Sequence, residues 1–71
     1  MSAPARRRLR DALASLDART RTVVALARLD GLTPAEIAVL LGATPGQVTR
    51  TLALAERVLR AAASEPRRRR A

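Results

Sequence analysis

The sequence predicts an all-α fold, a four-helix domain that ends in a helix-turn-helix. Two short motifs support this prediction: TPAE at residues 33–36 and TPGQ at residues 44–47 both have the features of a helix start. In each, a Thr hydroxyl can accept the backbone NH at N3, a Glu or Gln can reach back to the cap, and Pro occupies N1. Gly42 lies between the motifs, where a helix end favours the left-handed conformation that glycine adopts most easily. A short helix, a tight turn and a second capped helix form a helix-turn-helix.

The first helix is expected over about residues 5–15, after a disordered leader at residues 1–4. Its apolar residues recur three or four positions apart, while the other face is rich in arginine. The arginines fall near the start of the helix, where the helix dipole disfavours cations. This placement either marks the binding of an external anion or belongs to a flexible, solvated arm.

Asp17 favours the start of a second helix, since aspartate is among the best N-cap residues. This helix is expected from Ala18 to about Leu29, and Asp30-Gly31 would close it. Its apolar face, which includes a valine pair and Leu29, is broad enough to pack on both the first helix and the helix-turn-helix. Arg19 and Arg21 are expected on the outside.

The third helix is expected over residues 34–41 and the fourth from Pro45 to about residue 63. Ala38 marks a close contact between these two helices. Four larger apolar residues are spaced to fill the wedge around it: Ile37, Leu41, Val48 and Leu52. Glu65-Pro66 ends the fourth helix, because Pro disfavours the α conformation in the residue before it. Residues 64–71 are expected to be a disordered basic tail, so that the domain itself covers residues 5–63.

Composition narrows the function classes. Seventy-one residues form at most one small domain. The chain has no Cys, His, Trp, Tyr or Phe, which excludes thiolate and imidazole metal sites, a Ser-His-Asp triad and aromatic stacking platforms. No two ionisable groups are placed as an acid/base pair, so we expect neither an enzyme nor a small-molecule substrate, and no cofactor or metal. No apolar run is long enough to span a bilayer, and a cytoplasmic protein without a membrane partner is expected.

The charge balance predicts a polyanionic partner. Fourteen basic residues stand against six acidic ones, which gives a formal net charge of +8, and every basic residue is Arg. A basic excess of this size most often indicates nucleic acid. The codon bias of a GC-rich genome would explain Arg in place of Lys, but not the excess of positive over negative charge.

The pattern of residues resembles a known family. It reads L-x-x-R-x-R-x-V-V at residues 16–24 and G-L-T-x-x-E-I-A-x-x-L-G at residues 31–42, followed by Val48, Leu52, Ala55, Leu59 and Arg60. This series, over about residues 9–62, resembles region 4 of bacterial sigma factors, particularly the extracytoplasmic-function type. The resemblance implies a double-stranded DNA partner, with the last helix in the major groove of the promoter −35 element. It also implies that an apolar cleft in the first two helices docks on the flap of RNA polymerase, or that the domain pairs with a partner sigma subunit.

The candidate DNA contacts lie mainly on the fourth helix. They are Thr33, Thr44, Pro45, Gln47, Thr49, Arg50, Ala53 and Arg57. Gln47 and Arg50 can make bidentate contacts to adenine and guanine edges, and Thr33 and Thr44 can present helix N-termini to phosphates. A further set is expected to contact the DNA backbone without reading sequence: Arg19, Arg21, Arg67, Arg68, Arg69 and Arg70.

A second interpretation stays open. The resemblance implies basic residues at Thr49, Thr51, Leu54 and near Glu56, and none of these is basic here, which predicts weaker DNA binding. Leu54 and Val39 are apolar at positions expected to face solvent. The domain could therefore be a protein-interaction module that binds RNA polymerase or a sigma factor with little DNA binding of its own. The chain is either an excised domain or a stand-alone protein.

Overall fold

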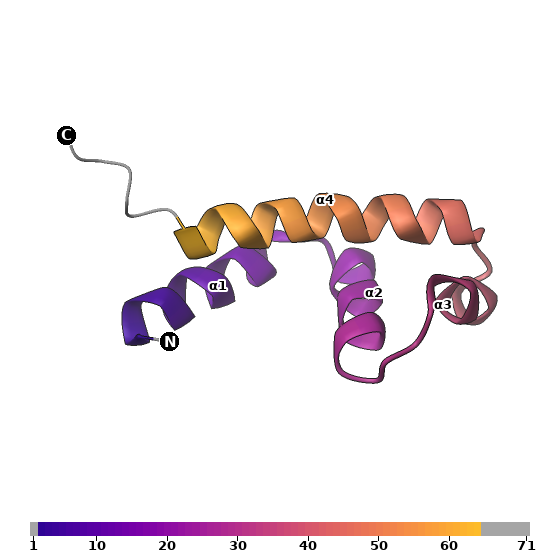
Figure 1. The fold of residues 1–71 in the computed structure, drawn as a ribbon, viewed down its shortest axis with the longest axis horizontal. Coiled ribbons are helices and arrows are strands. Elements are labelled where there is room, and N and C mark those ends of the chain that lie inside the picture. Colours follow the sequence, from indigo (N-terminus) through magenta and orange to yellow (C-terminus); the bar gives the residue numbers. More distant parts are fainter. Residues whose placement is uncertain (1, 65–71) are drawn as a thin grey trace.

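The computed structural model describes residues 2–64, which form four α-helices and no strand. They are α1 (Ala3–Ser15), α2 (Ala18–Arg28), α3 (Pro34–Leu41) and α4 (Pro45–Ser64). In Figure 1, α4 runs along the length of the molecule and the other helices lie on one side of it. α1 lies against its C-terminal half, and α2 and α3 lie near its N-terminal half. The predicted all-α fold with a C-terminal helix-turn-helix is confirmed.

Both predicted helix starts form complete capping boxes. At the start of α3, the Thr33 NH donates to Glu36 Oε1 at 2.8 Å, and the Glu36 NH donates to Thr33 Oγ1 at 3.1 Å. At the start of α4, the Thr44 NH donates to Gln47 Oε1 at 3.0 Å, and the Gln47 NH donates to Thr44 Oγ1 at 3.1 Å. Gly42 ends α3 with a φ of 67°, as the glycine between the motifs predicted. Local hydrogen bonds therefore fix the turn of the helix-turn-helix.

Removing one cap should lower stability measurably. Thr44→Ala is expected to cost about 1 kcal/mol, because it removes the oxygen that accepts the Gln47 NH. For a domain of this size that loss corresponds to a fall in Tm of roughly 4–8 °C. Thermal melts followed by circular dichroism test it, with Thr44→Ser as the control that keeps the hydroxyl. An unchanged Tm in Thr44→Ala would show that the cap contributes nothing to the fold.

Three helix boundaries differ from the prediction. α1 starts two residues early, at Ala3, so Ala3 and Pro4, expected in the leader, are helical. The cause is local, because Ser2 Oγ accepts the Ala5 NH at 3.2 Å and Pro4 suits a first turn. α2 ends at Arg28, and Leu29, expected on the apolar face, is 83% exposed. Ser64, expected in the tail, is the last residue of α4, and its hydroxyl donates to Arg60 O at 3.0 Å. The rest of the predicted tail, from residue 65 onward, lies outside the described residues.

The core lies where α2, α3 and α4 meet. Val23, Ile37, Ala38 and Val48 are buried together, and Ile37 has no exposed surface. The other predicted wedge residues, Leu41 and Leu52, are partly buried and pack against this cluster. α1 has no buried residue and rests on α4 instead. The packed core thus holds the helix-turn-helix rigidly against α2.

Three arginines cap the C-terminal ends of helices other than their own. Arg21, on α2, donates to carbonyls in the last turn of α1 and to its C-cap residue. Arg19 donates to Leu41 O at the end of α3, at 3.3 Å. Arg8, on α1, donates to Ala62 O in the last turn of α4, at 3.0 Å. Cations are favourable at helix C-termini because they meet unpaired carbonyls and the negative end of the dipole.

Candidate nucleic-acid interface

The exposed face of α4 collects most of the residues predicted to contact DNA. Val48 and Ala55 point into the protein, so the residues on the opposite side face solvent. The exposed members of the predicted set on this helix and its cap are Thr44, Pro45, Gln47, Thr49, Arg50, Ala53 and Arg57. Thr33 is exposed at the start of α3, where its hydroxyl already serves as the cap. Six of the predicted residues therefore lie exposed on α4, and the seventh, Thr44, caps its start.

Arg50 and Arg57 are the two cations among these seven residues. They lie seven residues apart, which is two helical turns or about 10 Å along the helix. Neither forms a hydrogen bond or an ion pair with another of residues 2–64. Arg50 lies beside a hollow of about 280 Å³ that Arg19 and Gln47 also line. Both guanidinium groups are therefore available to an external anion or to a base edge.

Gln47 has a structural task as well as an exposed position. Its Oε1 accepts the Thr44 NH at 3.0 Å, so the amide oxygen already serves the cap of α4. Recognition of adenine uses the oxygen and the NH₂ of a glutamine together. In this conformation Gln47 instead offers its NH₂ donors, which suit an acceptor such as guanine O6 or a phosphate oxygen.

The predicted backbone contacts divide into two groups. Arg19 and Arg21 are exposed, but their guanidinium groups donate to helix carbonyls. Their position is thus explained by the fold, and any DNA contact would use their remaining donors. The four predicted contacts of the tail, Arg67 to Arg70, lie outside the described residues.

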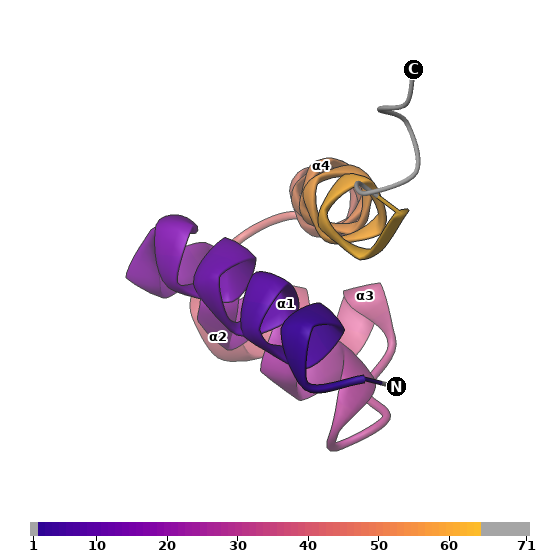
Figure 2. The ribbon, with the colours of Figure 1, turned by 90° about the vertical axis from the view of Figure 1, so that its left-hand side faces the viewer.

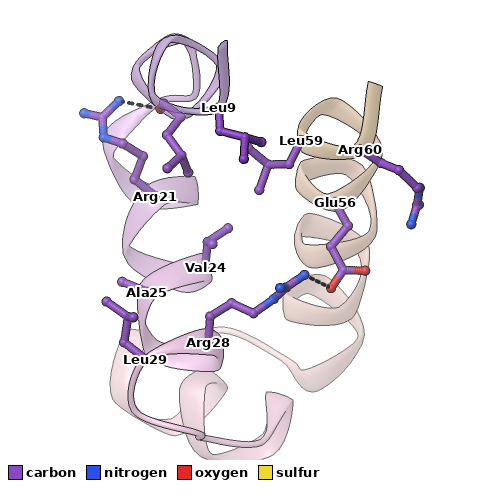
Figure 3. Close-up of a pocket in the computed structure, with 10 residues that line it drawn as sticks. Leu9, Arg21, Val24, Ala25, Arg28, Leu29, Glu56, Leu59 and Arg60 are labelled. Atoms are coloured by element: carbon purple, nitrogen blue, oxygen red, sulfur yellow. Dashed lines mark hydrogen bonds and ion pairs between the residues drawn. The ribbon is translucent and has the colours of Figure 1, made fainter. Parts of the chain in front are cut away.

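A second feature is an apolar groove of about 710 Å³ between α1, α2 and α4 (Figure 3). Its apolar residues are Leu9, Leu13, Val24, Ala25, Leu29 and Leu59, and its charged residues are Arg21, Arg28, Glu56 and Arg60. Figure 3 shows Leu9 of α1 and Leu59 of α4 pointing toward one another, and Arg28 paired with Glu56 at 2.8 Å. The sequence predicted a cleft in the first two helices; the contribution of α4 was missed, although the helical spacing of Leu59 pointed to an inward position.

The groove is bordered by more positive than negative charge. Three arginines and one glutamate lie among its lining residues, and the glutamate is already paired with Arg28.

At the start of α2, hydrogen bonds from Thr20 to the Asp17 carboxylate lower the pKa of Asp17 from the ordinary value, with a smaller contribution from Arg21 and Arg19. Asp17 is thus ionised at neutral pH and serves as the N-cap.

Searches for other kinds of site give negative findings. Within residues 2–64, no three His, Cys, Asp or Glu side chains are grouped so that they could hold a metal ion. None of the helices in this part of the chain has the length and apolarity required to cross a membrane.

Comparison with known proteins gives one match. The family model described as "Sigma-70, region 4" matches residues 6–59, which include most of α1, all of α2 and α3, and α4 as far as Leu59. The match therefore covers both the exposed face of α4 and the apolar groove. No curated protein and no solved structure matches the chain.

Proposed function

Because the chain belongs to the sigma-70 region 4 family, we propose that it is a transcription domain in which the exposed face of α4 reads promoter DNA. Domains of this family generally bind promoter DNA and RNA polymerase, and they are not enzymes. The observation that carries the proposal is the pair Arg50 and Arg57, both exposed on one face of a helix whose start is fixed by a capping box.

The residues of α4 have distinct roles in this proposal. Arg50 makes the bidentate contact to a guanine edge, because its fork of donors matches O6 and N7. Arg57, two turns further along, and Thr44, at the helix start, contact phosphates. Gln47 donates its NH₂ to a neighbouring acceptor while its oxygen keeps the cap. The arginines of the tail add phosphate contacts that carry no sequence information.

Selection from a randomised duplex pool tests the DNA-binding proposal. The purified chain is titrated by fluorescence anisotropy at low and at near-physiological salt, and the bound fraction is sequenced. A short enriched motif that persists at the higher salt is the expected result, because salt weakens phosphate contacts more than base contacts. Binding that vanishes with salt and enriches no motif would contradict sequence reading by α4.

We further propose that the apolar groove is the docking site for RNA polymerase. Its size suits one apolar helix, and its arginine-rich border suits acidic residues beside that helix. The flap of the polymerase is the segment expected from the family resemblance. The extracytoplasmic-function subtype and the domain limits of residues 5–63 likewise stay predictions.

Leu29→Asp should weaken polymerase binding about tenfold, since it places a charge on the apolar wall of the groove. Leu29 is 83% exposed, so the fold should tolerate the change. Val39→Asp is the matched control, because Val39 is equally exposed, at 82%, and lies outside the groove. Biosensor titration against core polymerase measures both variants. Equal binding by wild type and Leu29→Asp would place the docking site elsewhere.

The exposed apolar residues favour a second candidate function, a protein-interaction module with little DNA binding. Val39, Leu40 and Leu54 are all more than half exposed. If they contact polymerase or a sigma factor, Leu54→Asp should abolish capture of that protein while Arg50→Glu leaves it intact. Loss of polymerase binding in Val39→Asp, the control above, would also favour this candidate.

A further inference from the structure

The arginines of α1 are placed against the electrostatics of their own helix. Arg6, Arg7, Arg8 and Arg10 lie in its first eight residues, and its first turn contains no acidic residue. Positive charge is unfavourable near a helix N-terminus. At the other end of α1, where a cation is favourable, the helix has no basic residue of its own and is capped by Arg21. Arg8 caps α4, but helix stability does not explain Arg7 and Arg10, and the interface on α4 does not use them.

The fold places this cluster beside the C-terminal end of α4. The Arg8 Nε donates to Ala62 O at 3.0 Å, which joins the two segments. Figure 2 shows the N-terminal half of α1 next to the same end of α4. Arg7, Arg10 and Arg60 are exposed at this end, and none of the three forms a hydrogen bond or an ion pair with another of residues 2–64. Arg60 is one helical turn beyond Arg57 and also lines the groove, so we reserve the name distal arginines for Arg7 and Arg10.

The distal arginines are far from the start of α4. Its 20 residues give a length of about 30 Å between the Pro45 end and the Ser64 end. One turn of B-DNA is about 34 Å long, so a duplex lying along α4 would present backbone to both ends of the helix. Asp11, beside Arg10, is the one carboxylate in α1 and forms no ion pair with another described residue. Within residues 2–64, exposed arginines therefore outnumber carboxylates at this end.

We infer that the distal arginines form a second, sequence-independent binding surface for nucleic-acid phosphates. Guanidinium groups bind phosphate oxygens through paired, charge-assisted hydrogen bonds. The inference rests on the proposed function, because the same chain holds DNA at α4 and the distal surface contacts backbone beside the other end of that helix, on that duplex or on a second one. A membrane surface fits less well, because the chain has no aromatic residue and the leucines Leu9 and Leu13 face the groove.

The test measures how DNA binding depends on salt. Replacing Arg7 and Arg10 together with alanine should reduce the slope of log Kobs against log salt by about 1.8, at about 0.9 for each lost phosphate contact, on a random duplex of about 30 base pairs. Arg7→Lys with Arg10→Lys should keep the wild-type slope, because the charges remain. Alanine favours helix, so circular dichroism should show both double variants folded. A slope unchanged by the alanine variant overturns the inference.

The length of the duplex and a second probe identify the source of the phosphates. If the distal surface binds the duplex held by α4, the alanine variant should resemble wild type on a duplex of about 8 base pairs, or about 27 Å, because that duplex is shorter than α4 and cannot reach both ends. If it binds a second duplex, wild type but not the variant should bring two fluorescently labelled duplexes together. Tighter binding to vesicles of anionic lipid than to DNA, lost in the alanine variant, would overturn the inference in favour of a membrane.

The outcomes separate this inference from the proposed function. Arg50 is intact in the alanine variant, so that variant should select the same motif as wild type from the randomised pool. A reduced slope with an unchanged motif supports both proposals. A reduced slope when wild type itself enriches no motif leaves the distal surface standing and contradicts sequence reading by α4.

Discussion

Ile37→Ala is expected to unfold a large fraction of the molecules at room temperature. Ile37 is fully buried at the point where α2, α3 and α4 meet, and it packs with Val23, Ala38 and Val48. Removing such a side chain costs about 2–5 kcal/mol, because the lost apolar burial adds to the cavity left behind. A core in a chain of this size rarely supplies more than about 3–5 kcal/mol of net stability. The loss is therefore comparable to the whole stability of the domain.

Urea and thermal unfolding followed by circular dichroism at 222 nm check this expectation. Val39→Ala is the matched control, because Val39 lies two positions further along α3 and is 82% exposed. Alanine also favours helix more than valine, so the control should melt within a few degrees of wild type. If Ile37→Ala melts like the control, the centre of the core has been misplaced.

The features that the sequence predicted well are fixed by neighbours in the chain. Each capping box is made within four residues, and Gly42 takes its positive φ because of its place in the turn, so residue types and spacing suffice. The wedge around Ala38 was predictable for a related reason. Helical period decides which side of α3 and α4 faces inward, and a capped start sets the phase of that period.

The features that the sequence missed depend on contacts between distant segments. Arg8 and Ala62 are 54 residues apart, and Arg19 and Leu41 are 22 apart, so spacing could not show that these arginines cap other helices. The Leu29 error, by contrast, has a local origin. Leu29 keeps helical dihedral angles and its NH donates to Ala25 O at 2.8 Å, so its place on the helix, away from the buried Val23 and Val24, directs it toward the groove. Apolar character alone did not distinguish a core position from a groove wall.

The candidate interface shows both situations on one helix. Periodicity predicted which residues of α4 face solvent, since an exposed stripe follows from the buried one. Periodicity did not show which exposed side chains have hydrogen-bond partners within the fold. The Gln47 oxygen accepts the Thr44 NH, whereas Arg50 has no partner among the described residues. This difference is the reason that the proposed function gives Arg50 the main role in base recognition.

Arg50→Glu is therefore expected to reduce affinity for the selected DNA motif by about 100-fold. Loss of a bidentate guanine contact costs about 1–3 kcal/mol, and a carboxylate beside phosphates adds repulsion. The fold should persist, because Arg50 is exposed and glutamate is as good a helix former as arginine. Anisotropy titration against the motif and against single-base variants of it measures the effect. Discrimination at one base pair should disappear, whereas a loss that is uniform across sequences would mean that Arg50 contacts only phosphate.

Arg57→Ala separates charge from base recognition, because Arg57 lies on the same face two turns away. This variant should lower the salt slope by about 0.9 and weaken all duplexes equally, leaving the preferred motif unchanged. Arg50→Lys should do the reverse: it keeps the charge and the slope, but loses preference at one base pair because lysine has no fork of donors. If Arg50→Glu bound the motif as tightly as wild type while polymerase binding persisted, the exposed face of α4 would not read DNA sequence. The apolar groove, with Val39 and Leu54, would then be the functional part of the domain.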